Sequence, residues 1–247
     1  MIMSNENSDI LSLSVVVPVK DEGTNIADVY KAIKRMCENW GSSYEIIIVN
    51  DGSTDSTKDV CRSFHPLKYV ELDRNYGQTA ALECGFKLAS GDIVAAIDGD
   101  GQNDPADIPM MISYMLENNL DAVCGWRKNR KDYFYRRLLT RLAYVFRQVF
   151  LHDGIHDSGC TLKVFRKESL EALDLSDGQH RFIPAILQRH GLKVGEIEVS
   201  HHPRTKGKSK YNSSRRVFQG LLDMIALKKG EVKGGSVSFV VREIIDC

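Results

Sequence analysis

The sequence has few cysteines, and none of them forms a metal-binding or redox motif. The six cysteines among 247 residues are scattered along the chain and never occur as a Cys-x-x-Cys pair. Several fall inside apolar segments, where a free thiol behaves as a small hydrophobic side chain. This pattern excludes a disulfide-stapled secreted domain and a zinc ribbon, and it indicates a reducing compartment.

Long apolar runs are also missing. No run approaches the roughly 18 apolar residues that indicate a membrane-spanning helix. The first residues lack a basic segment followed by an apolar one, because residues 4–9 are polar. From the sequence we therefore expect no membrane span and no signal peptide.

The chain as a whole has no excess of charge of one sign, but individual segments do. The 33 Lys and Arg balance the 33 Asp and Glu, so nothing indicates a nucleic-acid partner. Residues 92–107 hold five acids and no basic residue, which suits a cation. Residues 127–147 hold eight basic residues against one Asp, and residues 204–216 hold six against none. These two basic segments suit anions.

Two common nucleotide-binding motifs are absent. The chain has no Gly-x-Gly-x-x-Gly fingerprint, and the Gly-Lys-Ser at residues 207–209 is preceded by His202 where a Walker A motif requires its first glycine. NAD-dependent enzymes and P-loop NTPases are therefore disfavoured.

What the sequence does contain is an alternation of apolar β-branched runs with amphipathic segments. The runs predict strands at residues 13–19, 45–49, 68–72, 93–97 and 121–124. Helical spacing occupies residues 25–39, 56–64, 78–89 and 105–118. The alternation predicts an α/β fold, a mostly parallel sheet with helices on both faces. We expect one domain over residues 11–229, a flexible N-terminus at 1–10 and a C-terminal tail at 230–247.

Acidic residues follow the fourth predicted strand directly. Asp98 and Asp100 are separated by one glycine, and ligands collect at the carboxyl ends of strands in such a sheet. Oxygen ligands of this kind suit Mg²⁺ or Mn²⁺ that keeps positions open for water and diphosphate oxygens. The alternative for this motif alone is an acidic surface turn.

A second polar loop follows the second predicted strand. Asp51 stands at the strand end, where a carboxylate can accept hydrogen bonds from a base or a ribose. The alternative is a turn followed by a helix cap, for which Thr54 and Asp55 have suitable side chains.

Motifs along most of the chain resemble those of a known family. The order VVVPVKDE, VNDGSTD, RNYGQTAAL and IDGDGQNDP is similar to family 2 glycosyltransferases of the Rossmann-like GT-A fold. Later motifs, GWR, YRR, DSGCTLKVFRK and HPRTKGKSKYN, resemble those of dolichyl-phosphate mannose synthases and bacterial polyprenyl-phosphate glycosyltransferases. The resemblance covers about residues 11–229.

The resemblance implies roles for particular residues. The residues expected to bind the nucleotide sugar are Pro18, Lys20, Glu22, Asp51, Asp98, Gly99, Asp100, Gln102, Arg127, Arg204 and Lys210. Among them, Asp100 and Gln102 are the expected metal ligands, and Asp100, Arg127, Arg204 and Lys210 are expected to be catalytic. Arg136 and Thr140 match positions proposed for the acceptor phosphate. Lys20 and Asp21 stand where relatives often have Tyr and Asn.

The reaction implied is an inverting, metal-dependent transfer of a hexose from a nucleotide sugar to a polyprenyl phosphate, giving a β-linked lipid phosphosugar. GDP-mannose with dolichyl phosphate is the first expectation. One alternative is a UDP-sugar, glucose or an amino sugar, with undecaprenyl phosphate; another is a non-catalytic subunit that binds a nucleotide sugar. The ionised acceptor phosphate needs no strong general base, which agrees with the lack of an obvious catalytic histidine.

A lipid acceptor implies a membrane surface as partner. Residues 133–146 combine Arg136 and Arg137 with apolar residues, which predicts a basic helix lying in the membrane interface; the alternative is a basic helix on the protein surface. Many relatives continue into two transmembrane helices, whereas a polar tail begins here at residues 228–230. We therefore expect a cytoplasmic protein, peripheral at the cytoplasmic face of a membrane, and a separate membrane protein is a candidate partner.

Overall fold

The computed structural model describes residues 11–128, 147–151, 153–203 and 237–247. In this part of the chain, strands form one sheet in the order β7-β5-β6-β4-β1-β2-β3-β8. The strands are β1 (Leu13–Val19), β2 (Tyr44–Asn50), β3 (Lys68–Leu72), β4 (Ile93–Ala96), β5 (Ala122–Trp126), β6 (Lys163–Arg166), β7 (Val194–Glu198) and β8 (Val241–Asp246).

The sheet is mixed, with a parallel centre. Strand β1 pairs in parallel with β2 and β4, β2 pairs in parallel with β3, and β5 pairs in parallel with β7. Strand β6 lies antiparallel between β4 and β5, and β8 lies antiparallel at the edge beside β3. The prediction of a mostly parallel sheet is confirmed.

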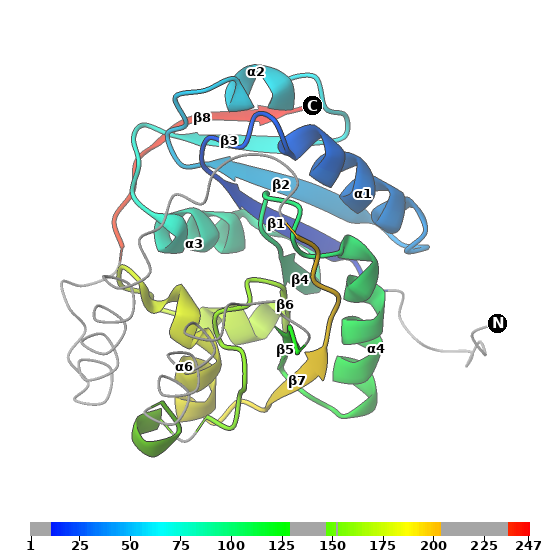
Figure 1. Cartoon of the computed structure of the whole chain (residues 1–247), viewed down its shortest axis with the longest axis vertical. Coiled ribbons are helices and arrows are strands. Elements are labelled where there is room, and N and C mark those ends of the chain that lie inside the picture. The colour runs from blue at the N-terminus through cyan, green and yellow to red at the C-terminus, as the bar shows by residue number, and fades with distance from the viewer. Residues whose placement is uncertain (1–10, 129–146, 152, 204–236) are drawn as a thin grey trace.

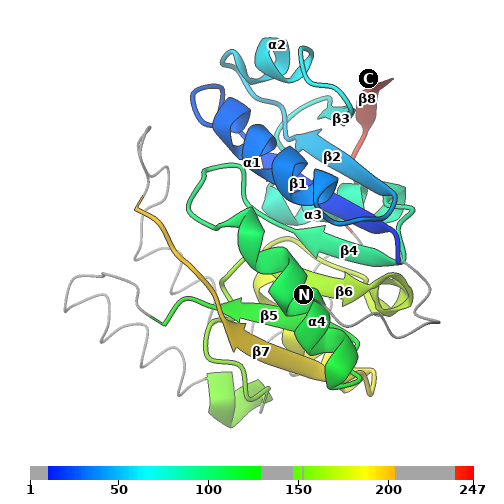
Figure 2. The same ribbon diagram turned by 90° about the vertical axis from the view of Figure 1, so that its right-hand side faces the viewer.

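Helices cover both faces of the sheet (Figures 1 and 2). One face packs against α1 (Ile26–Glu38), α2 (Thr57–Cys61) and α4 (Ile108–Glu117), and the other against α3 (Gln78–Leu88) and α6 (Ile183–Arg189). Short 3-10 helices are η1 (Pro105–Asp107), η2 (Lys167–Ala172) and η3 (Gln179–Phe182). No helix among the described ranges is long and apolar enough to cross a membrane.

Strand β1 shows how the sequence produces this layering. All seven of its residues are buried, and successive side chains point to opposite faces of a strand. Val15 and Val17 therefore pack in the core under α1 and α4, whereas Val16 packs in the core under α3. Helix α3 approaches Val16 closely at Gly85, where an added Cβ would lie 2.3 Å from a Val16 methyl carbon.

The end of the chain takes part in the sheet, which the sequence does not indicate. Strand β8 lies in the segment assigned to a tail, and the Leu67 N–H donates to the carbonyl of Cys247 at 2.9 Å. Glu243 of β8 also lies 3.1 Å from the Lys58 ammonium and 3.2 Å from the Arg62 guanidinium. The folded unit therefore includes residues beyond 229.

Candidate active site

Three loops meet at the carboxyl edge of the central strands. Because β1 is parallel to β2 and β4, the loops that follow these strands emerge on the same edge of the sheet. They come close together: a Cβ added at Gly99 would lie 2.6 Å from a Val19 methyl carbon and 3.6 Å from the Pro18 carbonyl oxygen. Eight of the residues expected to bind a nucleotide sugar lie in or beside these loops. They are Pro18, Lys20, Glu22, Asp51, Asp98, Gly99, Asp100 and Gln102.

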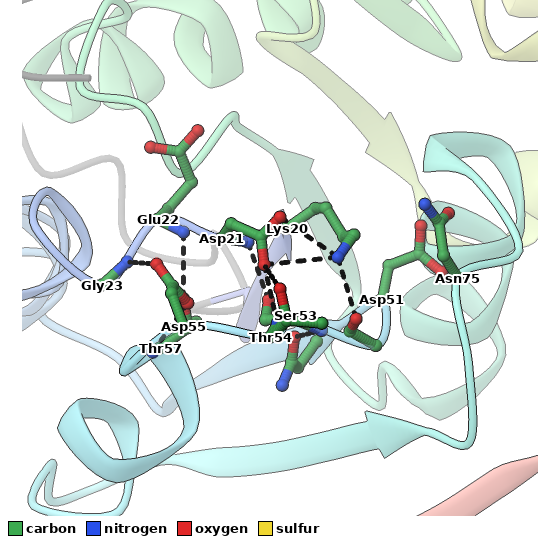
Figure 3. Close-up of polar contacts among 12 residues, drawn as sticks. Lys20, Asp21, Glu22, Gly23, Asp51, Ser53, Thr54, Asp55, Thr57 and Asn75 are labelled. Carbon is green, nitrogen blue, oxygen red and sulfur yellow. Dashed lines mark hydrogen bonds and ion pairs between the residues drawn. The ribbon is translucent and has the colours of Figure 1, made fainter. Parts of the chain in front are cut away.

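The loops after β1 and β2 are bonded to each other (Figure 3). The Asp21 N–H donates to Ser53 Oγ at 2.8 Å, and the Thr54 N–H donates to Asp21 Oδ1 at 2.7 Å. Asp21 adopts a left-handed φ of 48°, a conformation that Asp and Asn tolerate better than most residues. Asp55 accepts the N–H groups of Gly23 and of Thr57, the first residue of α2, each at 3.0 Å. Hydrogen bonds thus join the two loops along this edge of the sheet.

Lys20 and Glu22 stand on this edge with defined partners. The Lys20 ammonium donates to the Gly52 carbonyl at 2.9 Å and lies 3.1 Å from the Asp21 carboxylate. In Figure 3 the Lys20 side chain reaches across to the β2 loop, while the Glu22 carboxylate points away from it. Glu22 Oε2 accepts the side-chain amide of Asn25 at 2.7 Å. Lys20 thus puts one positive charge among the acids of this edge.

Asp51 has a structural role in the described part of the chain. Its side chain is buried, and its two carboxylate oxygens accept the N–H groups of Tyr76 at 2.6 Å and Gly77 at 2.9 Å. Burial raises its pKa, although these two hydrogen bonds act in the opposite direction. Gly52 adopts a φ of 59°, and a Cβ there would lie 2.5 Å from the Arg74 carbonyl carbon. Asp51 and Gly52 therefore fasten the loop that leads into α3; base or ribose recognition by Asp51 stays a prediction.

Two carboxylates lie at the centre of the edge. Asp98 Oδ1 accepts the side-chain amide of Gln78 at 2.8 Å, and Asp100 Oδ1 accepts the Gln102 N–H at 3.0 Å. Burial, together with the negative charge of Asp100, raises the pKa of Asp98 to about 6. Arg127 and Lys163 oppose this rise with their positive charges. A divalent cation bound here would relieve the remaining repulsion between the two acids.

The donor set fits a hard divalent cation bound together with a substrate. Asp98, Asp100 and Gln102 offer oxygen atoms, which Mg²⁺ and Mn²⁺ prefer. Among the residues that the structure describes, no three His, Cys, Asp or Glu side chains are grouped to hold a metal. Binding of such a cation by Asp100 and Gln102 stays a prediction.

The chain after β7 passes over this acidic loop. The His202 N–H donates to the Gln102 carbonyl at 2.8 Å, and Asn103 forms an isolated antiparallel bridge with His201. Arg204 lies outside the described residues.

Arg127 follows β5 and is held by a two-point ion pair. Its Nε donates to Asp157 Oδ2 at 2.7 Å, and a terminal nitrogen donates to Oδ1 at 3.0 Å. Its side chain is only 11% exposed. Burial acts to lower the pKa of Arg127, but the hydrogen bonds and charge of Asp157 outweigh it and raise the pKa. Arg127 is therefore a fixed, permanently charged group, and a grip on the donor diphosphate stays a prediction.

The basic segment at residues 127–147 is described only at its ends. Arg147 is buried, and its Nε lies 3.0 Å from Oδ2 of the buried Asp153. This charge is therefore matched inside the protein. Arg136, Thr140 and Lys210, together with the predicted membrane-surface helix at 133–146, lie outside the described residues.

The chain matches a family model along most of its length. The model for "Glycosyl transferase family 2" matches residues 14–174. A dodecaprenyl-phosphate galacturonate synthase of Rhizobium johnstonii is 38% identical over 232 residues, covering 91% of this chain and 68% of the relative. An undecaprenyl-phosphate 4-deoxy-4-formamido-L-arabinose transferase of Aeromonas hydrophila is 33% identical, covering 83% and 64%. The chain thus spans about two thirds of the length of these curated relatives.

Solved structures share the fold. Glucosyl-3-phosphoglycerate synthase from Mycobacterium tuberculosis, in complex with Mn²⁺, UDP and glucosyl-3-phosphoglycerate, has a TM-score of 0.72 and 19% identity. The match covers 89% of this chain and 80% of that one. The same enzyme in complex with Mg²⁺ and UDP has a TM-score of 0.69 at 18% identity, with the same coverage. The architecture is the GT-A fold, and with the matched motifs the chain belongs to glycosyl transferase family 2.

Proposed function

We propose that this glycosyltransferase moves a sugar from a UDP-sugar to a polyprenyl phosphate in an inverting, metal-dependent reaction. The observation that supports it most is the Asp98 and Asp100 pair at the carboxyl edge of the sheet, where burial, together with the negative charge of Asp100, raises the pKa of Asp98. A divalent cation would balance that charge and could at the same time bind the donor diphosphate. Relatives named for sugar transfer to dodecaprenyl and undecaprenyl phosphate support the acceptor class.

The proposed donor and acceptor differ from the first expectation based on the sequence. None of the matched relatives reported above is named for mannose or dolichyl phosphate, and the two solved structures reported above contain UDP. The alternative stated from the sequence, a UDP-sugar with undecaprenyl phosphate, is therefore the better one. A uronic acid or a modified pentose, the sugars in the names of the two relatives, extends that alternative beyond glucose and amino sugars.

In the proposed reaction an oxygen of the acceptor phosphate attacks the anomeric carbon of the donor sugar. The bond from that carbon to the diphosphate breaks, and the nucleoside diphosphate leaves with the electron pair. No proton has to be removed first, because a phosphate monoester is largely ionised near neutral pH. A bound divalent cation stabilises the charge that develops on the leaving diphosphate.

The residues of this chain bind and orient the reactants. Asp100 and Gln102 would hold the cation, with Asp98 beside them toward the ribose. Arg127 offers a fixed positive charge at the same edge. Arg204 and Lys210 are proposed to contact the diphosphate, and Arg136 with Thr140 the acceptor phosphate. Converging positive charges allow two anions, the donor diphosphate and the acceptor phosphate, to approach each other.

Radiolabel transfer tests the reaction. The purified chain is incubated with Mn²⁺, undecaprenyl phosphate in detergent, and one labelled donor at a time: UDP-galacturonate, UDP-4-deoxy-4-formamido-arabinose, UDP-glucose or GDP-mannose. We expect label in the organic phase with at least one UDP-sugar. Undecaprenol, which lacks the phosphate, is the matched acceptor control and should give none.

The remaining outcomes separate the alternatives. Transfer from GDP-mannose alone would overturn the choice of donor and restore the first expectation. Tight binding of UDP and Mn²⁺ without transfer from any donor would favour a non-catalytic subunit that binds nucleotide sugars.

A lipid acceptor places the reaction at a membrane surface. We propose peripheral association at the cytoplasmic face, where nucleotide sugars are available, with a separate membrane protein as a possible recruiting partner. Cosedimentation with vesicles tests this: the chain should sediment more with vesicles that contain undecaprenyl phosphate than with neutral vesicles. Equal sedimentation with both kinds of vesicle would show that the chain does not attach to the membrane through the lipid phosphate.

A further inference from the structure

A second acid, Glu196, lies next to the Arg127–Asp157 ion pair and is not among the residues expected to bind substrate. Glu196 lies on β7, whose register with β5 pairs Glu196 with Cys124, three residues before Arg127. Its side chain is only 7% exposed. One carboxylate oxygen accepts the Asp157 N–H at 2.8 Å, and the other accepts the His156 N–H at 2.9 Å. Glu196 therefore fixes the backbone on which Asp157 stands.

The same carboxylate also fixes the neighbouring side chain. Glu196 Oε2 lies 2.7 Å from Nδ1 of His156, and the His156 ring stacks on Trp126 with ring centroids 4.4 Å apart. Trp126 is the last residue of β5 and directly precedes Arg127. The turn at residues 156–157 is thus attached to β7 through Glu196 and to the end of β5 through stacking.

Asp157, held on this turn, in turn fixes the side chain of Arg127. It meets the guanidinium edge formed by Nε and one terminal nitrogen, a bidentate geometry that sets the plane of the group. A free arginine side chain populates many rotamers, so ordering it on binding has an entropic cost. Fixing it before the substrate arrives removes that cost from binding and holds the donor N–H groups in one orientation.

We propose that Glu196 and Asp157 are positioning residues: Glu196 holds the 156–157 turn, and Asp157 on that turn holds the Arg127 guanidinium toward the diphosphate of the sugar donor. This inference rests on the proposed function for the identity of the anion. The bonded chain Glu196 to Asp157 to Arg127 does not depend on it.

Nuclear magnetic resonance tests the positioning without any activity. Arg127 Nε–H should exchange slowly with solvent in the wild type, and markedly faster in Asp157→Asn and in Glu196→Gln. Glutamine at 196 keeps one acceptor oxygen but turns an amide donor toward a backbone N–H. Glu198→Gln is the matched control, because Glu198 lies on the same strand, is 47% exposed and pairs with Lys128 at 3.7 Å. It should leave the Arg127 signal unchanged, and unchanged exchange in Glu196→Gln would overturn the role of Glu196.

A double-mutant cycle tests whether Asp157 acts through Arg127. Affinity for UDP and for GDP, each with Mn²⁺, is measured by calorimetry. We expect Asp157→Asn to weaken binding of the preferred nucleotide about 10-fold in the wild type, a coupling typical of groups in contact. In the Arg127→Ala background the same change should give no further loss. Losses that multiply would show that Asp157 acts independently of Arg127 and would overturn the proposal.

Failure of this inference can be told apart from failure of the proposed function. If the two substitutions weaken nucleotide binding by independent factors, and the chain transfers sugar to undecaprenyl phosphate, the positioning role is overturned and the proposed function stands. If Asp157→Asn weakens nucleotide binding only when Arg127 is present, and the chain transfers sugar from none of the donors, the positioning role is supported and the proposed function is overturned. A wild type that binds neither nucleotide with Mn²⁺ would overturn the orientation of Arg127 toward a donor diphosphate.

Discussion

Asp51 is bonded to the backbone of Gly77, whose N–H donates to its Oδ2 at 2.9 Å, while Oδ1 accepts the adjacent N–H of Tyr76. The carboxylate at the end of β2 therefore anchors the start of α3, which begins at Gln78. Since Gln78 in turn donates to Asp98, this bond also helps place one of the two central acids.

We predict that Asp51→Ala lowers the free energy of unfolding by about 1–3 kcal/mol, because the Tyr76 N–H loses this acceptor and the Gly77 N–H keeps Asn75 Oδ1 at 3.0 Å but loses Asp51. The measurement is urea denaturation of the metal-free chain. Asp73→Ala is the matched control. Asp73 is exposed and lies in the loop between β3 and α3 that Asp51 anchors, so this change should alter stability little. Equal stability of Asp51→Ala and Asp73→Ala would mean that the anchor is unimportant.

Asp100→Ala should behave in the opposite way. Asp100 Oδ1 accepts the N–H of Gln102, two residues away on the same loop, and removal of this carboxylate lessens the repulsion on Asp98. We therefore predict no loss of thermal stability but loss of sugar transfer, by at least about 100-fold as for removal of a group that stabilises developing charge. Transfer that persists in Asp100→Ala at saturating Mn²⁺ would contradict its role as metal ligand.

The central strands could be predicted from the sequence because they are buried. The predicted strands at residues 13–19 and 68–72 coincide with β1 and β3, where β-branched and aromatic runs leave little ambiguity. Strand β6 is only four residues long and begins with Lys163, so it has no apolar run of its own. Strand β8 is stabilised by pairing with β3, a contact across more than 160 residues of chain that local patterns do not contain.

The candidate site could be predicted in part, for a similar reason. The position of a polar residue after a strand predicts that Asp51, Asp98 and Asp100 share one edge of the sheet, and the structure places them in loops there. What each carboxylate bonds to depends on distant segments. Glu196 gave no signal, because an acid on a short edge strand looks like any solvent-facing residue until β7 is placed beside β5.

The raised pKa of Asp98 predicts a pH-dependent stability. The folded pKa is about 6, above the value of about 4 for an unfolded Asp, so the contribution of Asp98 is present below about pH 4 and is lost as the pH rises through 6. Asp98→Asn keeps an acceptor for Gln78 and carries no charge. We predict that this variant is more stable than the wild type by about 1–2 kcal/mol at pH 7.5, and by less at pH 5.

Urea denaturation in the presence of a chelator measures this difference at both pH values. Added Mn²⁺ should reduce or reverse it at pH 7.5, because the cation stabilises the wild type through the charge that the variant lacks. A stability difference that is the same at pH 5 and pH 7.5 would contradict the assignment of the raised pKa to Asp98.

Glu45, at the opposite end of the central strands, should show the reverse dependence. Its carboxylate accepts hydrogen bonds from Ser14 at 2.7 Å, from the backbone and hydroxyl of Ser90 at 2.7 Å each, and from the Lys68 ammonium at 2.8 Å. Burial acts to raise its pKa, but these bonds outweigh burial and lower the pKa to about 2. The stability that they supply is present above the unfolded pKa of about 4.3 and is lost as the pH falls toward 2.

We predict that Glu45→Gln lowers the free energy of unfolding by about 1–3 kcal/mol at pH 7, because the neutral amide loses the ion pair and turns a donor toward other donors. The difference from the wild type should shrink steadily as the pH falls below about 4, as measured by urea denaturation across the range. Glu38→Gln is the control, since Glu38 is 55% exposed and lies 3.9 Å from Lys34. If Glu45→Gln matched Glu38→Gln at pH 7, the hydrogen bonds around Glu45 would contribute nothing to stability, and the link between β1, β2 and the start of β4 would have to rest on backbone pairing alone.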